Sequence, residues 1–404
     1  MKKNAISIGS LLGYAFMASI PISLMLFDGN RLSVGGVLLH ELILIAILLY
    51  LIWMIALQKK SINFIFLDWI AILYVFFALI PVLLSIDNLY LGARDYRHLF
   101  LVPLIAYLLL PFLFSDVQHI TNAFLFFIPG LLIGNLSLLP EFLRTGIRPQ
   151  IPNLITIGLL SSWSAVLAFI VRKGSSKIRY KIFIYLTTFM MLLFMSFSVS
   201  RGVLLAFLIT FFLSIFIFKK KIYQKIFIFS FIAILMIFYL SLSAVSEASL
   251  RTSSILSEEY REMRRSVYRL ATVDYYFDDF KNRMYLWKKA YNLGLERPIL
   301  GRGAFWYRNL GPSTPHNIFV AVFLTSGCVG MLLFILLIIN AYTTIFSLAR
   351  VETFKGLTKF LFISFTVLLI VGASNDFSGG RYLLFFVLLS GIATAKKIQK
   401  KDIS

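Results

Sequence analysis

Long apolar segments recur through most of this chain and constrain its fold more than any other feature. Of its 404 residues, 59% are hydrophobic and 14% are charged, whereas about 25% of the residues in soluble globular domains are charged. A membrane-spanning helix needs about 20 mainly apolar residues. We predict twelve spans, near residues 8–27, 35–57, 63–86, 98–114, 121–139, 153–171, 181–199, 202–218, 226–243, 317–339, 358–374 and 382–395. The predicted fold is therefore an all-α polytopic membrane protein.

The charged residues between these spans predict the orientation of the chain in the membrane. With twelve spans, both termini lie on the same side. The loops on that side are rich in lysine, including residues 219–221 and 400–401, and loops rich in Lys and Arg stay in the cytoplasm. Met1-Lys2-Lys3 before an apolar run resembles a signal peptide, but no small-residue cleavage site follows. We therefore predict an uncleaved first span and cytoplasmic termini.

A polar segment at residues 244–316 interrupts the apolar pattern before the tenth predicted span. The topology places it on the outer side of the membrane, where we expect a large helical loop. The chain then divides into nine spans within 1–243, this loop within 244–316, and three spans with a cytoplasmic tail within 317–404. The loop is long enough to carry part of a functional site.

The basic residues differ between the two sides of this topology. Nearly all lysines fall on the cytoplasmic side, and nearly all basic residues on the outer side are arginines. Either side chain satisfies the topology rule, but guanidinium binds phosphate in a bidentate way and always stays charged. The arginines could instead pair with outer acidic residues, which explains a charge but not the choice of arginine. The bias predicts a phosphate-containing ligand, such as a lipid-linked diphosphate, on the outer side.

Several outer arginines are candidates for binding that ligand. Arg201 precedes Gly202 in a tight turn between two predicted spans, where a lone arginine is costly unless it faces a cavity or an anion. Arg283 is expected in the first turn of an amphipathic helix that starts at Asn282. Arg302 lies between Gly301 and Gly303, which would let the backbone approach a ligand. Four further candidates could also be lipid-headgroup anchors: Arg94, Arg97, Arg144 and Arg148.

The histidines and the acidic residues within spans complete the set of ionisable groups. The four histidines lie far apart and the single cysteine, Cys328, lies in a predicted span, so we expect no zinc site, other metal site or disulfide. His119 is expected to be cytoplasmic and inert. Glu41 and Asp68 lie inside predicted spans, where hydrogen bonds between packed helices are a simpler expectation than catalysis. His316 immediately precedes the tenth predicted span, at the outer boundary of the membrane.

Two sequence patterns resemble the O-antigen ligase family. His316-Asn317, nine residues and then Gly327-Cys-Val-Gly330 fit the pattern H-[NSQ]-x9-G-x-x-[GTY], and Arg201-Gly-Val-Leu-Leu205 fits R-x-x-x-L. Arg283 and the following Pro298-Ile-Leu-Gly301-Arg-Gly303 are similar to a third region of that family. The resemblance is best over residues 190–395. For the first 180 residues it is only a similarity of topology.

The resemblance implies a GT-C type glycosyltransferase at the periplasmic face of a Gram-negative inner membrane. Such an enzyme transfers O-polysaccharide from undecaprenyl diphosphate to a sugar hydroxyl of lipid A–core in lipopolysaccharide biosynthesis, without a metal, nucleotide or other cofactor. Arg201 and Arg283 would stabilise the leaving diphosphate, and His316 would be the general base for an inverting attack. Asn317 and Arg302 would help to bind substrate.

Other functions fit parts of the same pattern. An O-antigen polymerase would use the same donor chemistry with a growing glycan as acceptor, and a protein O-oligosaccharyltransferase would use a protein. A transporter of lipid-linked oligosaccharide is a third alternative, but transporters usually show inverted repeats and charges at mid-membrane. The net charge of +21 is explained by topology and an anionic ligand, so we expect no nucleic-acid partner. The sequence carries no signal for an oligomeric state.

Overall fold

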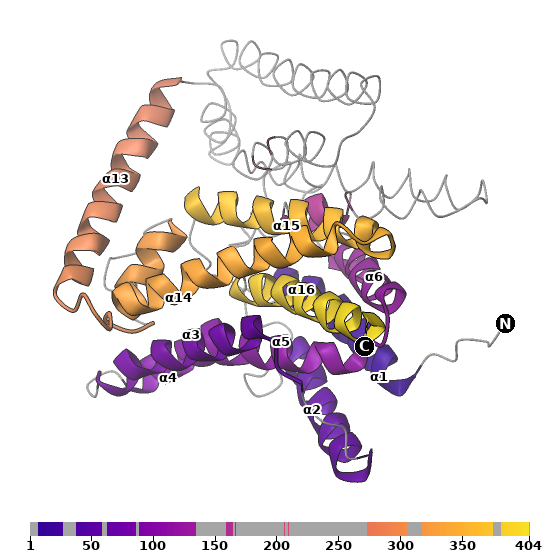
Figure 1. Cartoon of the computed structure of the whole chain (residues 1–404). Coiled ribbons are helices and arrows are strands. Elements are labelled where there is room, and N and C mark those ends of the chain that lie inside the picture. Colours follow the sequence, from indigo (N-terminus) through magenta and orange to yellow (C-terminus); the bar gives the residue numbers. More distant parts are fainter. Residues whose placement is uncertain are drawn as a thin grey trace, which may run out of the picture.

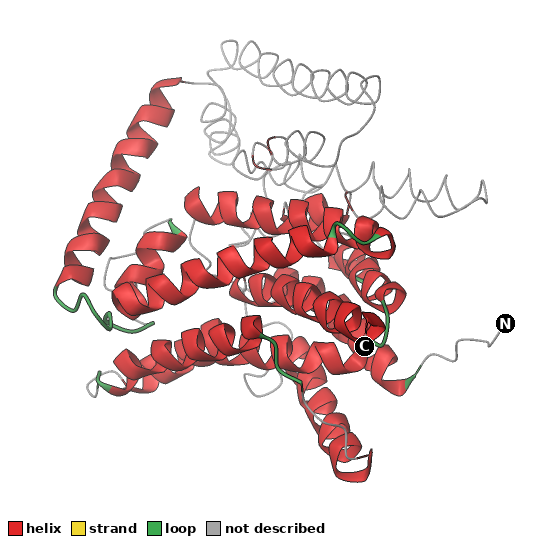
Figure 2. Ribbon diagram, viewed as in Figure 1, coloured by secondary structure: helices red, strands yellow, loops and turns green. Residues whose placement is uncertain are grey.

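The fold is known from a computed structural model that describes residues 7–26, 38–58, 63–85, 89–134, 159–164, 166, 206, 209, 273–304, 317–374 and 381–403. All regular secondary structure in these segments is helical, and they contain no strand (Figure 2). The predicted all-α class is confirmed for this part of the chain. The helices are α1 (Ile8–Leu26), α2 (Leu39–Gln58), α3 (Phe66–Leu83), α4 (Leu89–Tyr96), η2 (Arg97–Leu101), α5 (Val102–Leu113), α6 (Val117–Leu125), α13 (Val273–Leu295), α14 (Ile318–Leu348), η5 (Glu352–Phe354), α15 (Lys355–Ser374) and α16 (Arg381–Ile403).

Most of these helices have the length and composition of membrane spans. Seven described helical segments are long and apolar enough to cross a membrane, and the segment Ile8–Leu24 is a shorter apolar helix. Together they make the chain a multi-pass membrane protein. Four of the twelve predicted spans, at 153–171, 181–199, 202–218 and 226–243, fall wholly or largely outside the described residues.

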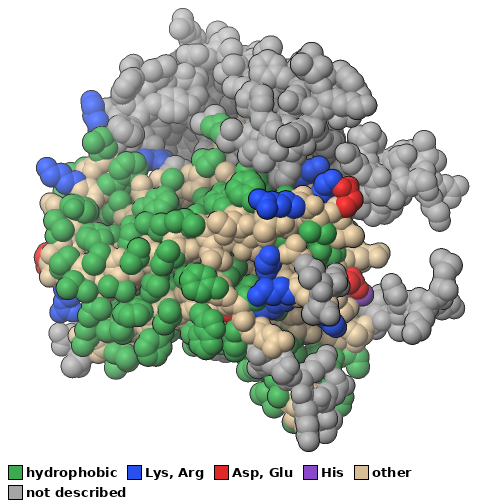
Figure 3. Space-filling view, in the orientation of Figure 1, with side chains coloured by type: hydrophobic (Ala, Val, Ile, Leu, Met, Phe, Trp, Pro, Cys, Tyr) green, Lys and Arg blue, Asp and Glu red, His purple; other side chains and the backbone are tan. Residues whose placement is uncertain are grey.

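Helix α16 forms the centre of the helical bundle. An 18-residue window within its segment Arg381–Lys401 has 89% of its residues buried, whereas Leu39–Ala56 of α2 has 28% buried. Figure 1 shows α16 between α14 and α15 on one side and α3 and α5 on the other, and α16 also contacts α6. The ring of Phe385 lies 5.4 Å from that of Phe334 in α14 and 5.5 Å from that of Phe365 in α15. Figure 3 shows a broad hydrophobic surface over the bundle, as expected of a face that meets lipid.

A buried carboxylate joins three helices at the end of α16 that carries the lysines. Asp68 of α3 has no exposed surface. Its side chain accepts hydrogen bonds from the Ile65 amide at 2.8 Å and the Tyr107 hydroxyl at 2.5 Å. Lys397 of α16 forms an ion pair with it at 2.9 Å. The expectation that Asp68 serves helix packing is confirmed.

The structure corrects three predicted helix boundaries. Residues 89–113 are helical throughout, so Arg94 and Arg97 lie in a helix and not in a loop. The predicted span began nine residues too late because this helix buries polar groups inside the protein, such as Asp95, and the Tyr96 hydroxyl donates to the Val75 carbonyl at 2.9 Å. α13 begins at Val273, which puts Arg283 in its middle and not in its first turn, and α14 continues to Leu348.

Candidate functional site

The start of α14 is fixed by the side chain of Asn317. Its backbone is extended, with φ −154° and ψ 120°, and its Oδ1 accepts hydrogen bonds from the amides of Phe319 at 2.9 Å and Val320 at 3.2 Å. These amides have no partner within the helix, so the side chain acts as an N-cap. Asn317 was predicted to bind substrate. In the structure it holds the first turn of the helix in place, directly after His316 in sequence.

α14 is broken at Gly327, which has φ 64° and ψ −164°. The break separates a first segment, residues 318–326, from the longer remainder of the helix. In a continuous helix the amides of residues 328 and 329 would donate to the carbonyls of residues 324 and 325. The break frees all four groups, and such groups are costly within a membrane unless the protein supplies new partners.

The loop after α13 supplies a partner for each of these groups. We call this arrangement, residues 298–303 paired with residues 324–329, the clasp. Its four backbone hydrogen bonds run from Arg302 N to Leu324 O at 2.8 Å, Gly303 N to Thr325 O at 2.9 Å, Cys328 N to Pro298 O at 2.8 Å and Val329 N to Ile299 O at 3.4 Å. The clasp therefore replaces the helical hydrogen bonds that the break removes.

Glycine is required where the two chains of the clasp cross. Gly301 has φ 75°, and a Cβ atom there would lie 2.5 Å from the amide nitrogen of Gly327. A Cβ atom on Gly327 would lie 2.3 Å from the carbonyl oxygen of Ile299. Gly303, with φ 93°, instead faces Pro81 of α3 at 3.4 Å. The close neighbour of Gly301 is protein backbone, which explains its conformation without a ligand, and the approach of a ligand to Gly301 and Gly303 stays a prediction.

The end of α13 packs against the end of the first segment of α14. The ring of Tyr291 stacks on that of Phe323 with centroids 5.4 Å apart, and Ala290 clusters with Leu324. The clasp joins the two C-terminal ends, because it begins three residues after α13 and includes the break in α14. Two helix segments that lie side by side with their C-terminal ends together must run in the same direction, as Figure 1 shows.

This parallel packing sets the position of Arg283. Arg283 is partly buried and lies seven residues before Ala290, on the same face of α13. Asn317 lies seven residues before Leu324, which clusters with Ala290. Seven residues of α-helix span about 10 Å. Arg283 therefore lies at the same height along the helix pair as Asn317, at the beginning of α14. Asn317 directly follows His316 in the sequence.

Arg302 links both of these helices. Its Nε donates to the carbonyl of Leu293 near the end of α13 at 2.9 Å, and its guanidinium group also pairs with Glu296. Its backbone amide belongs to the clasp and donates to Leu324. The structure thus gives Arg302 a role in holding the loop. Its role in substrate binding stays a prediction.

Residues 186–335 match the family model described as O-antigen ligase. This region is similar to O-antigen ligases, and we call residues 186–335 the O-antigen ligase domain for that similarity. No curated protein matches the chain by sequence. The O-antigen ligase domain includes α13, the clasp and the first segment of α14, together with Arg201, Arg283, Arg302, His316 and Asn317. This match is consistent with the superfamily of O-antigen ligases and polymerases.

Four predicted site residues of this chain lie outside the described residues: Arg144, Arg148, Arg201 and His316. Arg201 and His316 fall within the O-antigen ligase domain, and the other two precede it. Their places in the site stay predictions. Arg94 and Arg97 also precede the domain, and the structure describes both.

Arg94 and Arg97 have acidic partners within the protein. Arg97 lies 3.5 Å from Glu41 and 3.2 Å from the Nε2 atom of His98, whose Nδ1 atom lies 3.2 Å from the same carboxylate. Arg94 lies 3.6 Å from Asp95. Glu41 thus joins α2 to η2, a turn of π-helix, and its expected role in helix packing is confirmed. For these two arginines and Arg302, pairing with acids explains the charge without a ligand, and their predicted contacts with substrate stay untested.

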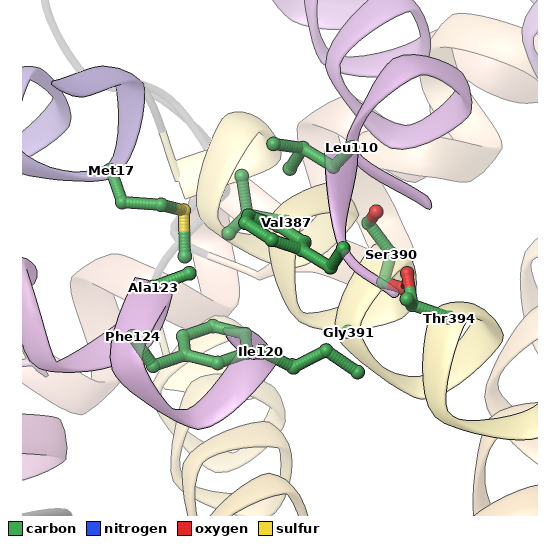
Figure 4. A pocket seen from close by; sticks show the side chains of 10 residues that line it. Met17, Leu110, Ile120, Ala123, Phe124, Val387, Ser390, Gly391 and Thr394 are labelled. Atoms are coloured by element: carbon green, nitrogen blue, oxygen red, sulfur yellow. Dashed lines mark hydrogen bonds between the residues drawn. The ribbon is translucent and has the colours of Figure 1, made fainter. Parts of the chain in front are cut away.

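A small cavity among the described residues lies outside the O-antigen ligase domain. It is lined by residues of α1, α5, α6 and α16, among them Met17, Leu110, Ile120 and Val387 (Figure 4). It has room for about one water molecule and no charged residue lines it, so it is unsuited to a diphosphate. Within the described segments, no three His, Cys, Asp or Glu side chains are grouped to hold a metal ion.

The sequence reasoning did not identify the clasp as a functional feature. Its signal was present as Gly327 in the family pattern and as Gly301 and Gly303 after Pro298. Each was read alone, because nothing in the sequence pairs two segments that lie some 25 residues apart. The contact between these two glycines with positive φ could be recognised only in the structure.

Proposed function

We propose that this protein is an O-antigen ligase that transfers O-polysaccharide from undecaprenyl diphosphate to a sugar hydroxyl of lipid A–core. The observation that carries the proposal is the position of Arg283 within the matched domain. A guanidinium group on the inner face of α13 comes level with the start of α14, the residue after His316. We expect this cation to act together with the imidazole of His316, which precedes Asn317 in the sequence.

The reaction breaks the bond between the anomeric carbon of the glycan and the diphosphate oxygen. Negative charge grows on the leaving oxygen, and Arg283 with Arg201 stabilises it as preorganised charges do at other transition states. His316 accepts the proton of the attacking sugar hydroxyl. Attack opposite the leaving group inverts the anomeric centre. Because the two arginines supply the positive charge, the proposed reaction is metal-independent.

The proposed architecture is a GT-C type fold with twelve spans and both termini in the cytoplasm of a Gram-negative bacterium. The two ends of α16 support this orientation. Its first residues contact η2, where the ring of Tyr382 lies 5.2 Å from that of Phe100, and its last turns carry Lys396, Lys397, Lys400 and Lys401. The lysine end would face the cytoplasm. The loop at residues 244–316 and the site would then face the periplasm of the inner membrane.

The His-Asn pattern favours a ligase over a polymerase, and loss of each enzyme leaves a different product on lipopolysaccharide. In cells, His316→Ala or Arg283→Ala should abolish polymer-capped lipopolysaccharide while polymer linked to undecaprenyl diphosphate accumulates. Lys289→Ala is the matched control, because Lys289 is a cation on the exposed face of the same helix. A polymerase defect would leave single repeats on the core. A normal ladder in either variant would exclude the proposed site.

A further inference from the structure

The direction of the first segment of α14 is set outside α14 itself. The break at Gly327 removes the helical hydrogen bonds that would hold this segment in line with the rest of the helix. The four hydrogen bonds of the clasp replace them. The longer part of α14 is fixed by the bundle, where Phe334 has no exposed surface. The loop at residues 298–303 therefore determines how the first segment leaves the bundle.

The same loop also fixes the end of α13. Arg302 donates through its side chain to Leu293 of α13 and through its backbone to Leu324 of α14, at 2.9 Å and 2.8 Å. Gly303 rests against Pro81 of α3, which anchors the loop to the bundle. Six residues thus hold α13, the first segment of α14 and α3 at one point. Any shift in this loop changes the register between the two helices.

We propose that the clasp positions Arg283 against the start of α14, and that Gly301 and Gly327 are positioning residues for glycan transfer. This inference rests on the proposed function, because it assigns the two glycines a role in that reaction. Neither residue touches substrate. Each acts by allowing the backbones to cross at a distance that any side chain would prevent.

Two glycines of the loop provide a matched pair of variants. Gly301→Ala and Gly303→Ala both place a Cβ atom at a positive φ angle, which is unfavourable for alanine. At Gly303 the new atom has an ordinary contact of 3.4 Å with Pro81, whereas at Gly301 it collides with the amide of Gly327 at 2.5 Å. Both variants have the strain of a positive φ angle, but only Gly301→Ala has the collision. A difference in their activities therefore reports the effect of the collision where the two backbones cross.

We expect purified Gly301→Ala to lose about 100-fold in kcat, as small displacements at a reacting centre do. The acidic limb of its kcat/KM profile should move to higher pH, because moving Arg283 away raises the pKa of the general base. Gly303→Ala should keep most of its rate and the wild-type profile. Equal losses in both variants, with no movement of the limb in either, would overturn the proposal.

A cross-link tests the clasp without relying on activity. Cys328 is the single cysteine of the chain, and its Sγ atom lies 4.0 Å from the carbonyl oxygen of Ile299. Ile299→Cys therefore creates one possible disulfide, detectable by mass spectrometry of oxidised membranes. We expect the bond to form and the locked protein to keep its transfer rate. A locked protein that regains activity only on reduction would contradict a fixed clasp.

The two tests separate the inference from the function. If the wild-type protein transfers no glycan while the cross-link still forms, the proposed function fails and the clasp stands as structure only. If the wild-type protein is active but Gly301→Ala behaves as Gly303→Ala does, the function stands and the positioning role fails.

Discussion

The ammonium group of Lys397 lies 2.9 Å from a carboxylate oxygen of Asp68, a side chain with no exposed surface. Tyr107 donates to the same carboxylate, so one negative charge connects α3, α5 and α16. Charges within a membrane protein are stable only when they are paired or hydrogen-bonded. Removing one member of the pair leaves the other without its main partner.

We predict that Lys397→Met destabilises the protein by about 3 kcal/mol, the low end for breaking a buried pair, because two other donors still serve Asp68. The double variant Asp68→Asn with Lys397→Met should lose less stability than the sum of the single variants. Thermal unfolding in detergent measures both. Lys400→Met, at an exposed position of α16, is the control. Strictly additive losses would show that the two residues do not interact.

The capping role of Asn317 predicts which substitutions it tolerates. Asn317→Ala should cost about 1 kcal/mol by leaving the first amides of α14 unpaired, whereas Asn317→Ser keeps a capping oxygen. We expect the serine variant to retain transfer activity and the alanine variant to lose much of it, because His316 precedes this turn. Activity and melting temperature of both variants check this. A serine variant as inactive as the alanine variant would indicate direct contact with substrate instead.

Substitutions in the ion pair between Arg302 and Glu296 test whether Arg302 has a structural role or binds substrate. Glu296 is 56% exposed and Arg302 is 11% exposed, so Glu296→Ala should cost less than about 1 kcal/mol, as exposed pairs do. Arg302→Ala should cost more, because it also removes the bond to Leu293. We expect Arg283→Ala to lose nearly all transfer activity, whereas Arg302→Ala should stay active with a KM for the lipid donor near the wild-type value. A clearly raised donor KM in Arg302→Ala would put Arg302 in contact with substrate.

The N-cap of α6 predicts a pH dependence on the proposed cytoplasmic side. Burial acts to raise the pKa of Asp116, but hydrogen bonds from the His119 amide at 2.8 Å and imidazole at 2.5 Å outweigh it, so this pKa lies below its ordinary value. A lowered pKa stabilises the fold above the unfolded-state pKa, and the benefit is lost as the pH falls through the folded-state value.

Melting curves of wild type and Asp116→Asn, recorded from neutral to acidic pH, test this dependence. The variant keeps a capping oxygen but has no charge to titrate. We expect the wild type to be more stable near neutral pH, with the difference vanishing in acid. A difference that grows as the pH falls would contradict the assigned direction. His119, expected to be inert, thus has a structural contact with Asp116.

The sequence was informative where a property is local. Apolar windows located the spans that became α2, α3 and α15 to within four residues, and found the start of α16 but ended eight residues before it does. The window near 317–339 found α14 but missed its extension to Leu348 and its break, because one glycine in an apolar run does not interrupt the hydrophobic signal. Arg94 and Arg97 were placed between two predicted spans, and the structure shows that helix continues through both residues.

Contacts between distant segments could not be predicted in the same way. The pairing of Glu41 with Arg97 joins residues 56 positions apart, and nothing in the sequence of either segment indicates its partner. Likewise, Gly301 and Gly327 were each noticed, but their crossing depends on the path of the whole loop. Residue types therefore indicated which chemistry to expect. The structure was needed to show which charged side chains are already paired within the protein.

Transfer by the purified protein tests the central claim most directly. The assay combines a polyprenyl diphosphate glycan of defined anomeric configuration with lipid A–core and compares wild type, Arg283→Ala and Lys289→Ala. We predict that wild type and Lys289→Ala form glycosylated lipid A–core with an inverted linkage, detected by mass spectrometry and NMR, and that Arg283→Ala forms almost none. Equal product from Arg283→Ala, or a retained linkage, would contradict a site in which Arg283 stabilises a diphosphate displaced in a single inverting step.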